Sequence, residues 1–299
     1  MGGLIQLLKT FVRKAPQYQQ MPNGKALHSL WRWISGFIFF LKQTILYLPT
    51  TARRLKALKS LKGSKTNKQV LIIANGPSSK DLNKSEIRRL QELGCDFIVM
   101  NGFGRMDIAE FCEANYYFLL DPDYDEENNP DRESINDYLR KNRKTFVVLS
   151  STAPMKNLYD GNKLFLNGIQ AVGLWNSESP ILPNTHPQSV LFAALKFAHY
   201  LGYSTIMVCG VDNSYYLHHV HNQFNEILIK NSGIHAYEES AEEMYRKTIP
   251  YLTRNMSDVL YSHAIFLRDL RKFANGKRIV NVGVNDVSND ALPFGRLLT

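Results

Sequence analysis

Cysteine is scarce in this sequence, which has only Cys95, Cys112 and Cys209 among its 299 residues. Their spacing fits no metal-binding motif, and an odd, sparse set of thiols does not form a disulfide framework. Two of them, Cys95 and Cys209, stand in or beside predicted strands, where buried free thiols are the usual finding. The cysteine content therefore indicates a reducing, cytoplasmic setting.

A long apolar run is also missing. Residues 33–41 are strongly apolar but span only nine positions between two charged residues. A helix that crosses a bilayer needs about twenty. Charges interrupt this region and no small-residue cleavage site follows it, which argues against a secretory signal. The first part of the chain therefore predicts neither a membrane span nor a cleaved leader.

Acidic residues are absent from residues 1–68, which hold 13 of the 36 lysines and arginines. The net charge of +9 thus combines this basic segment with a remainder that has 23 basic and 27 acidic residues. A nucleic-acid-binding protein more often carries its basic surface on the folded domain, so we expect no nucleic acid partner. We predict a basic helical appendage at 1–66 and one large domain at 67–299.

Aromatic residues lie among the basic ones in the appendage. Trp31, Trp33, Phe37, Phe39 and Phe40 are flanked by lysine and arginine. This pattern is typical of a helix that lies on anionic lipid, and it predicts peripheral attachment to the inner face of the cell membrane. The alternative is a helical hairpin packed on the large domain or on a second subunit of a homo-oligomer.

The familiar nucleotide-binding loops are missing too. The sequence has neither the three spaced glycines of the dinucleotide fingerprint nor the Gly-Lys-Ser/Thr of a Walker A loop. Instead, the β-branched run at 70–74 ends at Asn75-Gly76-Pro77-Ser78, before a predicted helix at 83–93. Glycine lets a ligand approach the backbone, and serine hydroxyls near exposed N–H groups suit a phosphate. An ordinary strand–turn–helix junction is the alternative.

Strands alternate with helices through the rest of the chain. Apolar runs predict strands at 96–101, 115–121, 145–151, 163–167, 204–212 and 278–283. Periodicity and end signals predict helices at 187–200, 238–251 and 261–274. This order indicates an α/β fold class, with a doubly wound, mostly parallel, Rossmann-like sheet.

Four of the predicted strands end in polar residues: Asn75, Asn101, Asp121 and Asp212. In open parallel sheets, ligands bind in the crevice beyond the carboxyl ends of the strands. Each residue alone is a common helix cap, but the four together predict a binding site at this edge.

The segment 184–189 opens the helix that precedes the strand at 204–212. Thr185, Gln188 and Ser189 offer hydroxyls and an amide beside exposed N–H groups, which suits a phosphate or a sugar. A capped helix start is the alternative interpretation.

Tyrosines and histidines follow Asp212. Tyr215 and Tyr216 come first, and His235 lies in a predicted loop, where a histidine can act as a general base near neutral pH. Three others lack the i,i+4 spacing of a zinc site, so we expect no metal there: His218, His219 and His221.

These residues resemble motifs of the bacterial family 42 sialyltransferases. Residues 73–78 are similar to the Gly-Asn-Gly-Pro-Ser opening of that family, and 100–103 resemble its second-strand Asn turn. The strand at 201–212 looks like its Leu-Gly-Tyr…Ser-Gly-Ile-Asp strand. His235, placed ahead of Arg246, resembles its general-base histidine. The resemblance runs in order from about residue 69 to residue 290.

The same pattern is similar to a wider group. This group holds the pterin diphosphokinase-like proteins, also called domain of unknown function 115, and relatives encoded in surface-polysaccharide gene clusters. Two positions depart from the sialyltransferase pattern. Asp121 replaces an Asn, and the donor-binding Thr-Ser-Gly appears only as Thr185-His-Pro-Gln-Ser189.

The sialyltransferase resemblance implies an inverting glycosyltransferase with a GT-A-variant fold. Its donor would be a CMP-activated acidic sugar such as sialic acid. Its acceptor would be a glycan or glycolipid of bacterial lipopolysaccharide or capsule biosynthesis.

The resemblance also implies roles for the residues. The turn at 75–78 would hold the phosphate and sugar, while Asn101 and Asp212 would contact cytidine or ribose. His235 would deprotonate the acceptor hydroxyl, and one of the two tyrosines after Asp212 would stabilise the departing phosphate. Hydroxyl donors can stabilise a leaving monophosphate, so no metal or other cofactor is required.

Two other functions stay open. The wider group implies a phosphotransferase that uses ATP and Mg²⁺, with Asp121 and Asp123 as candidate metal ligands. A non-catalytic scaffold that docks a polysaccharide assembly complex on the membrane is the third possibility.

Overall fold

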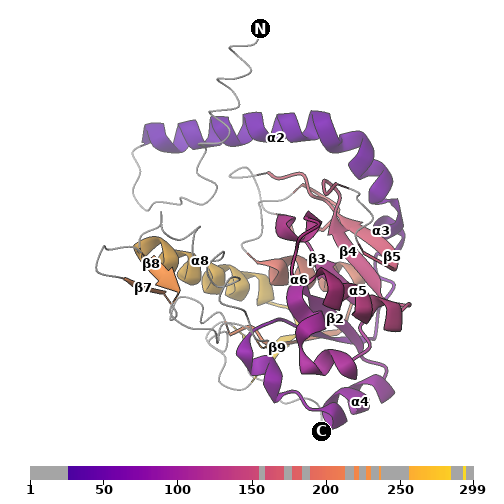
Figure 1. The fold of residues 1–299 in the computed structure, drawn as a ribbon. Helices are drawn as coiled ribbons and strands as arrows, with labels where there is room; N and C mark the ends of the chain where they lie inside the picture. The colour runs from indigo at the N-terminus through magenta and orange to yellow at the C-terminus, as the bar shows by residue number, and fades with distance from the viewer. Residues whose placement is uncertain are drawn as a thin grey trace.

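The computed structural model describes residues 26–154, 159–171, 177–183, 189–212, 219–221, 227–229, 236, 256–283 and 292–293. At its centre is a seven-stranded sheet with helices on both faces (Figure 1). All pairs in this sheet are parallel, and the strand order is β5–β4–β3–β2–β1–β6–β9. The predicted α/β class and doubly wound sheet are confirmed. The strands are β1 (Gln69–Ile73), β2 (Asp96–Met100), β3 (Tyr116–Leu119), β4 (Phe146–Ser150), β5 (Asn162–Leu166), β6 (Thr205–Cys209) and β9 (Ile279–Asn281).

Helices cover the sheet, and two of them, α4 and α6, begin at side-chain caps. Asn83 caps α4 through a reciprocal pair of hydrogen bonds with the backbone and side chain of Glu86. Ser189 caps α6 by accepting a backbone N–H. The helix therefore begins at Val190 and not at the predicted Pro187. The flanking helices are α4 (Lys84–Glu92), α5 (Arg132–Lys141), α6 (Val190–Leu201) and α8 (Met256–Ala274).

Alternation along β1 shows how one apolar run supplies two cores. Val70 and Ile72 are buried in a cluster that includes side chains of α6 and α8. Leu71 and Ile73 are buried in a second cluster, with side chains of α4 and α5. Because successive side chains of a strand point to opposite faces, a run that is apolar at every position fits only a sheet covered on both sides.

Shorter elements connect the strands. Four 3₁₀ turns follow β1, β2 and β3: η1 (Pro77–Asp81), η2 (Asn101–Arg105), η3 (Asp107–Glu110) and η4 (Pro122–Asp125). A separate antiparallel pair is formed by β7 (His219–His221) and β8 (Ile227–Ile229). The helix predicted at 238–251 lies outside the described residues. Cys95 and Cys209 are buried free thiols, as the sequence predicted, and so is Cys112.

The chain reverses its direction of winding at β1. From β1 the chain proceeds through β2, β3, β4 and β5 on one side, and then returns to place β6 and β9 on the other side. The carboxyl ends of β1 and β6 therefore flank the point at which the strand order reverses. In open α/β sheets this is where the ligand crevice lies.

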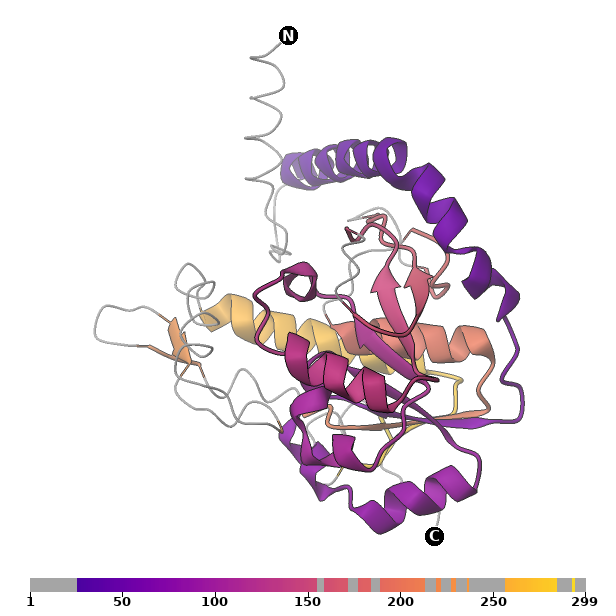
Figure 2. The ribbon, with the colours of Figure 1, turned by 45° about the vertical axis from the view of Figure 1, so that its right-hand side comes forward.

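The basic segment forms α2 (Ala26–Arg54) and α3 (Lys56–Ser60). In both views α2 lies outside the layers that flank the sheet (Figures 1 and 2). Leu55 and Leu58 belong to the same buried cluster as α6, and backbone bonds join Gly63 and Lys65 to the end of α6. Residues from Thr51 onward are thus packed on the large domain.

Among the described helices, none combines the length and the apolar character that are needed to span a bilayer.

Candidate functional site

Two residues predicted from separate parts of the sequence meet at the reversal point. The backbone N–H of Ser78 donates to the two carboxylate oxygens of Asp212 at 3.2 and 3.0 Å. The Ser78 hydroxyl also bonds to Asp212 Oδ2 at 3.0 Å. Ser78 lies in η1 just after β1, and Asp212 follows β6. The pair therefore joins the ends of the two strands that flank the predicted crevice.

Close packing of the two strand ends explains the glycines there. Gly76 donates its backbone N–H to the carbonyl oxygen of Gly210 at 2.9 Å. A Cβ at Gly76 would collide with the Asp212 carboxylate and with that same carbonyl oxygen. Gly210 has a φ of +73°, and a Cβ there would strike the carbonyl of Ala74. Both glycines are thus required by the approach of one strand end to the other.

The Asn75 side chain links β1 to β2. With its amide oriented to satisfy both groups, its nitrogen donates to Met100 O at 2.9 Å and its oxygen accepts from Gly102 N at 3.2 Å. The carbonyl oxygen of Asn75 accepts the backbone N–H of Ala236 at 2.8 Å. Asn75, Gly76 and Pro77 stay partly exposed. The turn is therefore fixed by the protein and still open to solvent.

Asn101 has a strained backbone conformation and an unsatisfied side-chain oxygen. Its φ is +49°, a left-handed value that costs an L-residue free energy. Its side-chain Oδ1 is buried and, in the described part of the chain, has no hydrogen-bond partner. Its carbonyl oxygen, in contrast, accepts the hydroxyl of Tyr117 at 2.7 Å. Strained and unsatisfied groups gather at functional sites, which agrees with the position of Asn101 at the end of β2.

Asp212 is a buried carboxylate. Burial raises the pKa of the Asp212 carboxyl above its ordinary value, and the hydrogen bonds from Ser78 only partly oppose this. Among the described residues, no lysine, arginine or histidine forms an ion pair with it. A carboxylate whose burial costs net free energy, and which lies beside a crevice, is a candidate for ligand binding.

Two other predicted residues act as caps. Asp121 is exposed at the start of η4, where its Oδ1 accepts the backbone N–H of Asp123 at 3.5 Å. Ser189 is the N-cap of α6 and accepts from Leu191 N at 3.1 Å. Each side chain has a local structural use, which is the alternative that the sequence left open for both.

The remaining predicted site residues lie outside the described residues: Thr185, Gln188, Tyr215, Tyr216, His218 and His235. His219 and His221 belong to β7. Ala236, which follows His235 in the chain, is described and buried, and it contacts the Asn75 turn through the hydrogen bond given above.

Gly210 is the residue that sequence reasoning missed. Its signal was present, because a glycine two residues before a strand-end Asp often marks a close approach of two backbones. Cys209 also reaches the site, since its thiol donates to Ser78 O at 3.6 Å. The sequence placed both residues in a buried strand but did not show that η1 packs against them.

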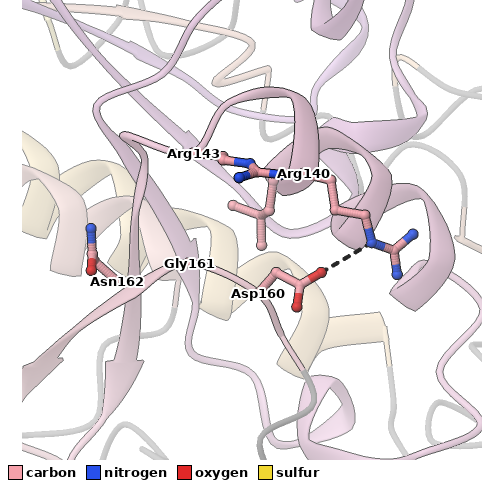
Figure 3. Close-up of a pocket in the computed structure, with 6 residues that line it drawn as sticks. Arg140, Arg143, Asp160, Gly161 and Asn162 are labelled. Atoms are coloured by element: carbon pink, nitrogen blue, oxygen red, sulfur yellow. Dashed lines mark hydrogen bonds and ion pairs between the residues drawn. The ribbon is translucent and has the colours of Figure 1, made fainter.

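A cavity of about 430 Å³ lies elsewhere, between the end of α5 and the start of β5 (Figure 3). Arg140 and Arg143 line it, but the Arg140 guanidinium already pairs with Asp137 at 2.8 Å and with Asp160 at 3.1 Å. The cavity is at the amino edge of the sheet, opposite the Ser78–Asp212 pair. In the described ranges, no three His, Cys, Asp or Glu side chains gather in a way that could hold a metal ion.

The comparisons with known proteins found a structural likeness but no match of sequence. No model of a protein family matches the sequence, and no curated protein matches it. Among solved structures, the chain is similar to one described as MAf glycosyltransferase from Magnetospirillum magneticum AMB-1, with 16% identity and a TM-score of 0.37. The match covers 64% of this chain and 30% of that one, so the chain spans about a third of that protein's length. At this level the likeness carries no functional conclusion, which must come from the site.

Proposed function

We propose that this protein is a glycosyltransferase that uses a nucleotide sugar, with a CMP-activated acidic sugar as its donor. The observation that carries the proposal is the Ser78–Asp212 pair at the reversal point of a parallel sheet. This is the position at which such sheets bind nucleotides. The sialyltransferase resemblance of the same residues supports the choice of donor.

The chemistry divides among the residues as follows. The turn at 75–78 is partly exposed at Asn75, Gly76 and Pro77, and the donor phosphate would lie against this exposed part. Asp212 has acceptor capacity left beyond its bonds to Ser78, and it would accept from ribose or from the cytosine amino group. Asn101 would contribute a further contact from the end of β2.

Displacement at the anomeric carbon then needs a base for the acceptor and stabilisation of the leaving CMP. His235 would take the proton of the acceptor hydroxyl, which makes that oxygen a better nucleophile. Its neighbour Ala236 is bonded to the Asn75 turn, which supports a place for His235 beside the donor. Tyr215 or Tyr216 would donate a hydrogen bond to the phosphate as the bond to the sugar breaks.

Thermal shift with CMP, CDP, UDP and ATP, each with and without Mg²⁺, tests the donor. CMP or CDP at about 100 times its Kd should raise the melting temperature by roughly 5–10 °C without metal. Ser78→Ala should reduce this shift, because it removes the hydroxyl bond to Asp212 and leaves the carboxylate held only by the Ser78 backbone N–H. Ser204→Ala is the matched control, since its exposed hydroxyl bonds Lys68 O at the amino edge.

Two results would replace the proposal. If only ATP with Mg²⁺ stabilises the protein, the phosphotransferase interpretation with Asp121 and Asp123 as metal ligands becomes the better one. If no nucleotide shifts the melting temperature with or without Mg²⁺, the non-catalytic scaffold becomes the better interpretation.

A further inference from the structure

Helix α2 has an apolar face that points away from the protein. At 3.6 residues per turn, five apolar residues before Pro49 fall within an arc of roughly 100° on one side of the helix. All five are exposed. This set, called the outward face below, consists of Phe37, Ile38, Leu41, Ile45 and Leu48.

The exposure of this face is unusual. Ile45 is 78% exposed, and the outward face holds five of the nine exposed large hydrophobic residues in the described chain. Leu46 and Tyr47 are exposed on other sides of α2, and Leu93 and Leu182 lie far from α2 in sequence. A soluble monomer rarely leaves so many apolar side chains contiguous in water, so the outward face is expected to have a partner. Phe39 and Phe40, predicted from sequence as contact residues, are only partly exposed and do not belong to it.

The opposite side of α2 is attached to the large domain by polar contacts. Gln43, which lies about 180° from the centre of the outward face, accepts Gln170 N at 2.7 Å. Beyond Pro49, Thr51 bonds the Ser151 hydroxyl at 3.0 Å, and Arg54 donates to the Ser151 carbonyl at 2.6 Å. These contacts hold α2 in the orientation that leaves the outward face exposed.

The charge around α2 selects the partner. No acidic residue occurs in residues 1–68, and Lys42, Arg53, Lys56, Lys59 and Lys62 lie on or next to α2 and α3. A second copy of this chain would bring like charges together around the apolar contact. An anionic lipid surface complements both the apolar face and the surrounding charge. The observations therefore favour a bilayer over a second subunit.

The attachment also places α2 relative to the candidate site. Ser151 follows β4 and Gln170 follows β5, so α2 is held at the carboxyl edge of the sheet. The Ser78–Asp212 pair lies at the same edge, beyond β1 and β6. Figure 2 shows α2 above the sheet and its flanking helices, with the chain descending through α3 toward the sheet.

We propose that the outward face of α2 docks on an anionic bilayer and holds the carboxyl edge of the sheet beside the lipid surface. If the protein transfers sugar as proposed above, its acceptor is then a molecule anchored in that bilayer. Docking itself does not depend on the proposed function, whereas the class of acceptor rests on it.

Vesicle flotation of the full chain tests the docking step. We expect the wild type to float with phosphatidylcholine vesicles that contain 30% phosphatidylglycerol, and to float less with phosphatidylcholine alone or in high salt. Ile38→Asp/Ile45→Asp should lower vesicle affinity by about a hundredfold or more, because each change removes an exposed apolar side chain that docking would bury in the bilayer, and adds a negative charge. Leu93→Asp is the matched control and should float like the wild type, since Leu93 is 65% exposed at the other edge of the sheet.

Three outcomes would overturn the docking proposal. The first is a wild type that stays with the unbound fraction at every lipid composition. The second is a double variant that floats as well as the wild type. The third is a double variant that changes an oligomer into a monomer in light scattering while vesicle binding is unchanged, which would make the outward face a subunit interface.

Nucleotide thermal shift on the same proteins keeps the two proposals apart. The double variant should keep the CMP shift of the wild type, because none of its substitutions touches the Ser78–Asp212 pair. Flotation without any nucleotide shift would contradict the proposed function and leave docking intact. A nucleotide shift without flotation would contradict docking and leave the proposed function intact.

Discussion

Replacing Asp212 with asparagine separates the structural part of this residue from its part in ligand binding. The carboxylate is buried and accepts hydrogen bonds from the backbone N–H and the hydroxyl of Ser78. Its raised pKa means that burial of the charge costs more free energy than these bonds return. Asparagine has the same shape, offers an oxygen to the Ser78 N–H, and offers an amide hydrogen to the Ser78 oxygen.

Opposing effects set the expected magnitude. Asp212→Asn weakens the bonds from Ser78 but also removes the cost of burying a charge. We therefore expect the free energy of unfolding at pH 7 to change by about 1 kcal/mol or less. Asp212→Ala leaves the N–H and the hydroxyl of Ser78 without acceptors and should lose about 2–4 kcal/mol. Both variants should bind the nucleotide at least about tenfold more weakly, because a single hydrogen bond to a charged group is worth that much.

Urea unfolding and calorimetric titration with CMP are the measurements. The folded state holds the Asp212 proton more tightly than the unfolded chain does, so ionisation of this group destabilises the fold. This cost is present at pH 7 and disappears as the pH falls through the raised pKa toward the ordinary value of 3.8. The wild type should therefore gain stability relative to Asp212→Asn over that range.

Two results would refute this reasoning. If Asp212→Asn unfolds as easily as Asp212→Ala, the hydrogen bonds to the charge outweigh its burial. If Asp212→Asn binds the nucleotide like the wild type, Asp212 only fixes the turn after β1.

Four further changes test other parts of the structure. Gly76→Ala should lower the free energy of unfolding by about 1–3 kcal/mol in urea, because its Cβ collides with backbone and carboxylate; wild-type stability would contradict the close approach. Leu58→Ala should cost about 2–5 kcal/mol in the same assay, and a cost below about 1 kcal/mol would exclude α3 from the core. Tyr203→Phe should cost about 1.5–3 kcal/mol, since it removes a 2.6 Å bond to the buried Asp96 carboxylate; an unchanged urea midpoint would count against it. His235→Ala should keep the fold and lower kcat by about 10²–10⁴-fold with loss of the low-pH limb of the rate profile, and full activity would show that the base lies elsewhere.

The sequence by itself determined the strands of the seven-stranded sheet and the fold class, but it predicted no strand at β7 or β8. The run at 70–74 is apolar at every position, which only a strand covered on both faces can bury, and β1 is such a strand. Asn83 and Glu86 specified the start of α4 because both halves of the capping box are local in sequence. Interactions within a few residues are encoded in the order of those residues, so these features could be read directly.

The candidate site could be predicted from the sequence only in part. The positions of Asn75, Asn101 and Asp212 at strand ends followed from the lengths of apolar runs. The bond between Ser78 and Asp212 did not, because it joins residues 134 positions apart and depends on β6 lying next to β1. Any of several strand orders would have fitted the same alternation of strands and helices.

The orientation of α2 was likewise decided by tertiary structure. Its composition predicted an amphipathic, basic helix, but helical periodicity does not say which face meets the protein. The bonds from Gln43, Thr51 and Arg54 to the ends of β4 and β5 decide it, and they leave the apolar side outside. Contacts between residues about a hundred positions apart form only once the sheet has brought its carboxyl ends to one edge, so no local pattern could have shown them.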